Sequence, residues 1–175
     1  MALIKTYQSH RPKFDPSVYL AENATLIGDI EIGAHSNVWY SAVLRGDVGP
    51  IRIGERSSIQ DLVMIHCTLN HSRTTIGDDV IVGHGAILHG CTIEDQVLIG
   101  MNATVLDRAV IPRHTIVAAQ ALVPEGKVLE SGYIYAGVPA KKLKPLTEAQ
   151  IAHFAASAAR YVRYAEDHRQ AEDLS

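Results

Sequence analysis

The chain has 175 residues, the size of one ordinary domain, and 47% of them are hydrophobic, which suffices for a continuous apolar core. A net charge of −3 argues against binding to nucleic acid or to an anionic membrane surface. With two cysteines, and no N-terminal apolar run long enough for a signal peptide or membrane span, we expect a single cytoplasmic domain.

Residues 1–17 are a short lead-in that contains two prolines. From residue 18 to residue 138 an aliphatic residue then recurs at about every sixth position. The repeated positions are Leu20, Leu26, Ile32, Val38, Leu44, Ile53, Ile59, Ile65, Ile76, Val82, Leu88, Ile93, Ile99, Val105, Ile111, Val117 and Val123. A hexapeptide period over about a hundred residues predicts a parallel β-helix, in which short strands stack coil upon coil.

The period also predicts which side chains are neighbours, because three hexapeptides make one triangular coil and every third repeat lies on the same wall. One wall should contain the column Leu44, Ile65, Leu88, Val105 and Val123. The residue after each member points to the opposite face, since side chains alternate along a strand. His66 and His89 follow two members of this column, so we expect them on adjacent coils, about 4.8 Å apart in backbone. There they could bind one metal ion.

A third histidine belongs to a different wall. Asp61 and His84 each lie two places after an aliphatic residue of that wall, Ile59 and Val82 respectively. A corner separates this wall from the histidine pair, so one chain cannot easily bring His84 to it. A neighbouring molecule packed against the corner could do so. The register therefore predicts a metal site between subunits.

Two segments interrupt the repeat, namely residues 46–50 and the longer run 67–75. Excursions of this kind emerge at the corners of a solenoid, usually on one functional edge. The extra residues between Ile65 and Ile76 are expected to absorb the mismatch in the repeat, so that the coils stay in register.

Residues 145–172 are predicted to form a C-terminal helix. Thr147 is the expected N-cap, and Gln150, at the third helical position, completes a capping box. The apolar positions at helical spacing are Ile151, Phe154, Ala155, Ala158, Tyr161, Val162 and Ala165. A free helix of this length is marginal in water, so this face should pack against the solenoid or a partner.

Several short motifs accompany the three histidines. They are Arg45-Gly46-Asp47, Gln60-Asp61, Ile65-His66, Gly83-His84-Gly85 and Leu88-His89-Gly90. With the closing segment 135–140 and the terminal helix, they resemble the gamma-class carbonic anhydrases and their bacterial homologues over nearly the whole chain. Hexapeptides alone would be unspecific, because many acyltransferases contain them.

The resemblance implies a left-handed β-helix, a homotrimer, and one metal ion at each of three subunit interfaces. The ion would be Zn²⁺, or alternatively Fe²⁺ or Co²⁺. His66 and His89 would come from one subunit and His84 from its neighbour, the division that the register also suggests. The implied activity is the reversible hydration of carbon dioxide to bicarbonate by a metal-bound hydroxide.

Five further residues receive catalytic roles from the resemblance. Gln60 would hydrogen-bond the hydroxide or the bicarbonate, and Asp61 would orient the site from behind the ligands. Arg45 and Asp47 would form an ion pair across the subunit boundary. Tyr135 would lie near the metal.

The chain departs from the family in one respect. The best-characterised members have an acidic residue after the Arg-Gly-Asp motif and a glutamate-bearing loop, which move the proton away from the metal. Here Val48-Gly49-Pro50 follows the motif, and the 67–75 excursion contains His71 but no carboxylate. His71 is either a substitute relay or an ordinary loop residue. Without a relay we expect hydration to be slow.

Three other functions stay open. The segment 137–141 is common to hexapeptide-repeat acyltransferases, which need no bound metal. A metal-binding scaffold with little catalysis would explain the missing acidic relay. A metal-dependent thioester hydrolase is the third. Metal content separates the acyltransferase from the other functions, and hydration kinetics separate an enzyme from a scaffold.

Overall fold

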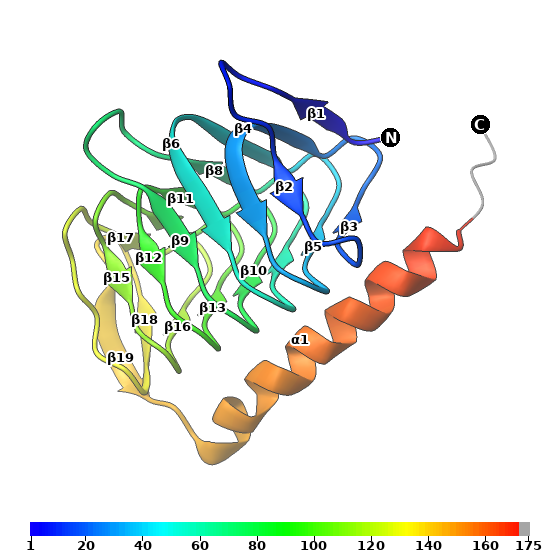
Figure 1. The fold of residues 1–175 in the computed structure, drawn as a ribbon. Helices are drawn as coiled ribbons and strands as arrows, with labels where there is room; N and C mark the ends of the chain where they lie inside the picture. The colour runs from blue at the N-terminus through cyan, green and yellow to red at the C-terminus, as the bar shows by residue number, and fades with distance from the viewer. Residues whose placement is uncertain (172–175) are drawn as a thin grey trace.

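The computed structural model describes residues 1–171, which form a parallel β-helix followed by one C-terminal helix (Figure 1). Within these residues the β18–β19 pair is antiparallel, and the other pairs of named strands are parallel. The mainly β solenoid with a terminal helix confirms the fold class predicted from the hexapeptide period.

The strands belong to two sheets. The first sheet contains β1 (Leu3–Lys5), β2 (Lys13–Phe14), β4 (Thr25–Ile32), β6 (Val43–Ile53), β8 (Met64–His66), β9 (Thr74–Ile76), β11 (Ile87–His89), β12 (Thr92–Ile93), β14 (Thr104–Val105), β15 (Val110–Ile111) and β17 (Leu122–Val123). The second sheet contains β3 (Tyr19–Leu20), β5 (Asn37–Val38), β7 (Ser58–Ile59), β10 (Ile81–Val82), β13 (Leu98–Ile99), β16 (Ile116–Val117), β18 (Tyr133–Ala136) and β19 (Lys141–Pro145).

The two sheets make three walls because β4 and β6 are long enough to continue around a corner. The first half of β6 pairs with β8, and its second half pairs with β9 on the next wall. The second sheet forms the third wall. Inward-facing aliphatic side chains from all three walls fill one continuous core.

The predicted column of one wall is confirmed by the strand register. Leu44 pairs with Ile65, Ile65 with Leu88, Leu88 with Val105, and Val105 with Val123. All five side chains have no exposed surface. The insertions between the repeats therefore leave the vertical alignment of the coils intact.

The corner between the third wall and this column is built from left-handed backbone turns. Ser41, Leu62, Gly85 and Asn102 occupy the same place in successive coils, and each has a φ between 55° and 69°. This conformation costs an L-residue roughly 1–2 kcal/mol, and glycine or asparagine reduces that cost. Leu62 is neither glycine nor asparagine, so it bears this cost in full. Its side chain is also 66% exposed, so burial in its own chain does not offset the cost.

The lead-in is part of the solenoid, which differs from the expected boundary at residue 18. Leu3 pairs with Thr25, and Lys13 pairs with Glu31, so β1 and β2 both add parallel strands to β4. The physical reason is that β4 would otherwise leave a row of unpaired backbone groups at the first coil.

The excursions also differ in form. Residues 46–50 stay within β6, where the register against β4 shifts between Gly28 and Ile30. A bulge of this kind re-aims a side chain without ending the strand. The longer excursion leaves the solenoid at Cys67 and returns at β9, and residues 67–73 form a loop.

The terminal helix α1 extends over Glu148–Arg169, with Thr147 as N-cap and the predicted capping box to Gln150. The helix begins later than residue 145, because the preceding residues are the antiparallel strand β19. The predicted end at residue 172 lies outside the described residues. Over the described part of the chain, no helix combines the length and the apolar character needed to cross a bilayer.

Helix α1 runs along the third wall and contacts β3, β5, β7 and β10 (Figure 1). Its buried side chains are Phe154, Ser157, Ala158 and Ala165. Ala155, which was expected on this face, is exposed, and Ser157 takes its place. The helix is therefore rotated slightly from the orientation that hydrophobicity alone predicts.

We expect Ile99→Ala to lower the free energy of unfolding by about 2–5 kcal/mol, because the substitution leaves a cavity in the core. Ile99 has no exposed surface and lies on the third wall. Guanidinium unfolding at one fixed protein concentration would measure the change. The matched control is Leu143→Ala, whose side chain is 64% exposed. A change within about 0.5 kcal/mol for Ile99→Ala would contradict the packing described above.

Candidate functional site

His66 and His89 are neighbours on adjacent coils, as the register predicted. They are the last residues of β8 and β11, and they are paired in the parallel ladder. The Nδ1 atom of His66 is 3.3 Å from the Nε2 atom of His89. Two ring nitrogens, one from each coil, therefore face the same small volume.

The other nitrogen of His66 contacts a carboxylate. Its Nε2 atom is 3.0 Å from Asp47 Oδ1, and Arg45 Nη1 donates to Asp47 Oδ2 at 2.6 Å. Burial opposes ionisation of Asp47, but the hydrogen bonds from Arg45 and His66 outweigh it and lower the pKa of Asp47. The Arg45–Asp47 pair was expected to cross a subunit boundary, whereas here it forms within one chain. The bulge in β6 makes this possible, because it turns Asp47 towards His66.

His89 contacts a carboxylate of its own, Asp107, which was not among the residues predicted from the sequence. His89 Nδ1 is 2.8 Å from Asp107 Oδ2, and Ser72 donates to the other oxygen of Asp107. Burial again opposes ionisation, but the bonds from Ser72 and His89 prevail and lower the pKa of Asp107. Asp107 lies two places after Val105, the next column member along the chain, so the register contained a signal for it.

His84 lies at the neighbouring corner and pairs with Asp61. The strands before them are in register, with Val82 opposite Ile59. His84 Nδ1 is 2.8 Å from Asp61 Oδ2, and the His84 side chain is 50% exposed. Among residues 1–171 of a single chain, no group of three or more histidine, cysteine, aspartate or glutamate side chains is arranged to hold a metal ion. His84 is therefore half-exposed, and its contact with Asp61 involves only the Nδ1 atom of the ring.

The carboxylates determine where the imidazole protons lie. An ionised carboxylate only accepts hydrogen bonds, so the nitrogen that faces it must carry the proton. Burial lowers the pKa of His66, and nearby Arg45 adds to the effect, although Asp47 opposes it. A neutral His66 that is protonated at Nε2 then directs the lone pair of its Nδ1 atom at His89 Nε2. Arg45 Nη2, 3.4 Å from His66 Nδ1, is the cation that lies nearby.

Gln60 lines a cavity of about 380 Å³ between the third wall and α1, together with His84 and Tyr161. The positions that correspond to Gln60 in the next two coils, Gly83 and Gly100, also line this cavity. Gln60 itself is only 4% exposed. Tyr161 thus lies in the same cavity as the predicted site residues Gln60 and His84. The helical spacing had predicted only a packing role for it.

Tyr135, the tyrosine expected near the metal, is not brought to the histidine pair. It is 4% exposed in the core at the C-terminal end of the solenoid. Its hydroxyl accepts a hydrogen bond from the Glu130 amide at 2.8 Å and lies 3.3 Å from the Glu130 carbonyl. These contacts give Tyr135 a packing role in this chain, because β18 turns its side chain inwards.

His71 does have a carboxylate neighbour, although none is present in its own loop. His71 Nε2 is 3.0 Å from Glu125 Oε1, and Arg108 Nη2 donates to the same oxygen at 2.6 Å. Both partners come from later coils, so a reading of the loop alone could not find them. Cys67, next to His66, is buried, and burial raises the pKa of its thiol, which disfavours a thiolate ligand.

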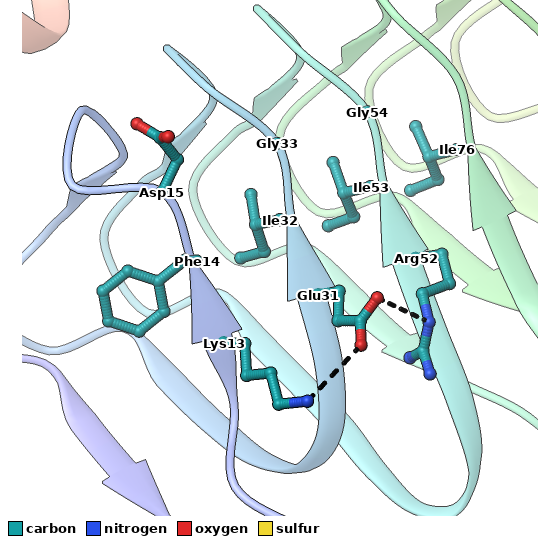
Figure 2. Close-up of a pocket in the computed structure, with 10 residues that line it drawn as sticks. All are labelled: Lys13, Phe14, Asp15, Glu31, Ile32, Gly33, Arg52, Ile53, Gly54 and Ile76. Atoms are coloured by element: carbon teal, nitrogen blue, oxygen red, sulfur yellow. Dashed lines mark ion pairs between the residues drawn. The ribbon is translucent and has the colours of Figure 1, made fainter.

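A separate cavity of about 630 Å³ lies on β2, β4 and β6 and contains none of the predicted site residues (Figure 2). Its charged groups neutralise one another, since Glu31 lies 3.9 Å from Lys13 Nζ and 3.3 Å from Arg52 Nε. Figure 2 shows these side chains forming a ladder across neighbouring strands. The charged side chains of this cavity are therefore already paired with one another.

Comparison with known proteins is consistent with this geometry. No family model matches the chain. A protein named gamma carbonic anhydrase 2, mitochondrial, from Arabidopsis thaliana is 41% identical over 90% of this chain. The chain spans 58% of the length of that plant relative. A protein named a probable carbonic anhydrase from Methanocaldococcus jannaschii is 46% identical, over 86% of this chain and 94% of the relative.

The chain belongs to the gamma carbonic anhydrase family. A solved structure from Bacillus cereus, provisionally named an acetyltransferase, superimposes with a TM-score of 0.93 and 34% identity. The superposition covers 95% of this chain and 96% of that one. These relationships confirm the left-handed, hexapeptide-repeat class of the β-helix. They also show that proteins of very similar structure carry different functional names.

Proposed function

We propose that the protein is a metal-dependent carbonic anhydrase that hydrates carbon dioxide reversibly at a site shared between subunits of a homotrimer. The observation that carries the proposal is the facing pair of nitrogens on His66 and His89. Membership of the gamma carbonic anhydrase family supports the same activity.

The pair fits a metal ion by a simple geometric test. Two nitrogens bound at 2.0–2.1 Å to a tetrahedral ion lie about 3.3–3.4 Å apart. The separation between His66 Nδ1 and His89 Nε2 is 3.3 Å. Asp47 and Asp107 hold the protons on the opposite nitrogens, so each imidazole offers a lone pair to the ion. We propose Zn²⁺, with Fe²⁺ or Co²⁺ as alternatives, because three imidazoles suit all of these ions.

The third ligand is proposed to be His84 of a neighbouring subunit. An exposed apolar surface lies between His84 and the histidine pair, and it supports this assembly. Its members are Leu62 (66% exposed), Met64 (37%), Ile87 (41%) and Met101 (53%). Burial of such a patch against a second copy would stabilise the trimer and exclude water around the site.

The residues around the ligands suit the reaction. An ion held by neutral imidazoles supplies Lewis acidity, which lowers the pKa of a water molecule to about 7. The Gln60 amide can hydrogen-bond the substrate or product, and its 4% exposure keeps it in one place. Asp61 holds the Nδ1 proton of His84 and so fixes the orientation of that ring. Arg45 anchors Asp47, which in turn orients His66.

We propose that hydration is slow at low buffer concentration. Val48 occupies the position where other members have an acidic residue, so no relay follows the Arg-Gly-Asp motif. Proton removal then depends on His71 or on an external base. We place the protein in the cytoplasm, an assignment supported by two cysteines that form no disulfide.

An acyltransferase is the second candidate, and the Bacillus cereus structure favours it by its name. A metal-binding scaffold and a metal-dependent thioester hydrolase are also compatible with the histidine pair. An acyltransferase needs no metal, whereas the other three functions do. Hydration kinetics then separate a carbonic anhydrase from a scaffold or a thioester hydrolase.

The purified trimer is expected to contain about one divalent ion per chain. His66→Ala and His89→Ala should each abolish binding, because each removes one of the two facing nitrogens. Elemental analysis of protein purified without oxygen would measure this. The control is His10→Ala, an exposed histidine of the lead-in. Full occupancy in His66→Ala would refute the assignment.

Mixed trimers test the sharing of the site. His84→Ala chains supply only the histidine pair, and His66→Ala chains supply only His84. Random mixing of equal amounts should restore about one interface in four. Metal analysis of co-refolded trimers would detect it, while each variant alone should bind none. Recovery of a metal-loaded monomer would end this part of the proposal.

Hydration of carbon dioxide should be measurable by stopped flow, and its rate should rise with imidazole concentration because external base removes the proton. Val48→Glu should raise the rate at low buffer and change it little at high buffer. Gln60→Ala in the metal-loaded trimer should lower the rate at all buffer concentrations. If the metal-loaded wild-type protein is no faster than a Gln60→Ala, Asp61→Ala variant, the scaffold or the thioester hydrolase becomes the better assignment.

A further inference from the structure

The loop of residues 67–73 folds back onto the histidine pair, and Ser72 makes a central contact. Ser72 donates a hydrogen bond to Asp107 Oδ1, and the Thr68 amide donates to Ser72 Oγ at 3.0 Å. The other oxygen of Asp107 faces His89 Nδ1 at 2.8 Å. A continuous chain of hydrogen bonds thus links the loop backbone to the imidazole of His89.

The residue after His89 is a glycine, which leaves room for these hydrogen-bonded side chains. Gly90 has a φ of +62°, and a Cβ atom there would collide with Ser72 Oγ and Asp107 Oδ1. Any other residue at this position would therefore displace the serine or the aspartate. Asp107 is also well protected, since its side chain is only 14% exposed.

The return of the loop is tied to the same two histidines. Thr74 Oγ1 donates to the His66 carbonyl at 2.7 Å and accepts from the Gly90 amide at 3.0 Å. The loop tip has a separate tether, in which His71 meets Glu125 at 3.0 Å. The Ser72–Asp107 contact and the His71–Glu125 contact can therefore be removed independently.

We propose that Asp107 and Ser72 are positioning residues for His89. Asp107 holds the proton on Nδ1, so that Nε2 keeps its lone pair towards His66, and Ser72 fixes Asp107 in the orientation that does this. Through Ser72 and Asp107, the 67–73 loop thereby determines whether the His66–His89 pair presents a lone pair from His89 to a metal ion. The metal-binding part of this inference rests on the proposed function. The position of the proton on the His89 imidazole does not depend on it.

The choice of tautomer is the distinctive consequence. A neutral histidine in water favours the proton on Nε2, and the hydrogen bond at the other nitrogen decides which tautomer a folded protein contains. Without the Asp107 acceptor, His89 should revert to the Nε2–H form. That form directs an N–H group, instead of a lone pair, at His66.

The test uses Asp107→Ala, Ser72→Ala and Glu125→Gln in the full chain. Nitrogen-15 NMR of metal-free protein would report the His89 tautomer, and competition with a chelator would report affinity for Zn²⁺. Asp107→Ala should convert His89 to the Nε2–H form and weaken Zn²⁺ binding about 10–100-fold. Ser72→Ala keeps the carboxylate and should weaken binding roughly 2–10-fold, the effect of one hydrogen bond.

Glu125→Gln is the matched control, because it loosens the loop tip and leaves Asp107 untouched. It should change neither the tautomer nor the affinity. The proposal is overturned if His89 keeps its Nδ1 proton in Asp107→Ala, or if Glu125→Gln weakens binding as much as Ser72→Ala. Should Asp107→Ala fail to fold, an unchanged affinity in Ser72→Ala overturns it.

The two proposals fail in different ways. If wild-type protein binds no Zn²⁺ but the tautomer changes as described, the proposed function is wrong and the positioning role stands. If wild-type protein binds Zn²⁺ and Asp107→Ala binds it equally well with the Nδ1 proton in place, the positioning role is wrong and the metal site stands.

Discussion

The parallel stacking of the coils is the constraint on which the rest of the molecule depends. Each coil hydrogen-bonds to the next with a spacing of about 4.8 Å, and a slip by one residue would turn every side chain to the opposite face. Ile65 opposite Leu88 in the core therefore determines that His66 lies opposite His89 outside it. The hydrophobic core and the candidate site are consequences of the same register.

Each of the three histidines contacts an aspartate, and a different local feature of the β-helix positions each aspartate. A bulge in β6 turns Asp47 to His66, vertical stacking at a corner places Asp61 beside His84, and the next coil supplies Asp107 to His89. The contacts share one chemical result. In each case the carboxylate contacts one ring nitrogen and leaves the other without a carboxylate partner, so hydrogen bonding would organise the proposed metal site before an ion binds.

Features that repeat with the hexapeptide could be predicted from the sequence, and features that depend on non-periodic segments could not. The histidine pair and the His84–Asp61 contact follow directly from counting. Tyr161 was missed because the repeat does not specify how α1 docks against the third wall. Glu125 was missed because it meets His71 only through the conformation of a loop. Asp107 is an intermediate case. Its position two residues after Val105 follows from the repeat, but its contact with His89 was not predicted.

Leu62 connects the energetics of the fold to the proposed assembly. Its left-handed backbone costs roughly 1–2 kcal/mol, and its exposed side chain gains nothing from the core of its own chain. A strained, exposed leucine beside a half-exposed histidine makes physical sense if a second copy covers both. Because the proposed ligands then come from two chains, metal binding and trimerisation must stabilise each other to the same extent. Folding, assembly and metal loading would therefore be linked equilibria, with the corner at Leu62 and His84 as their common surface.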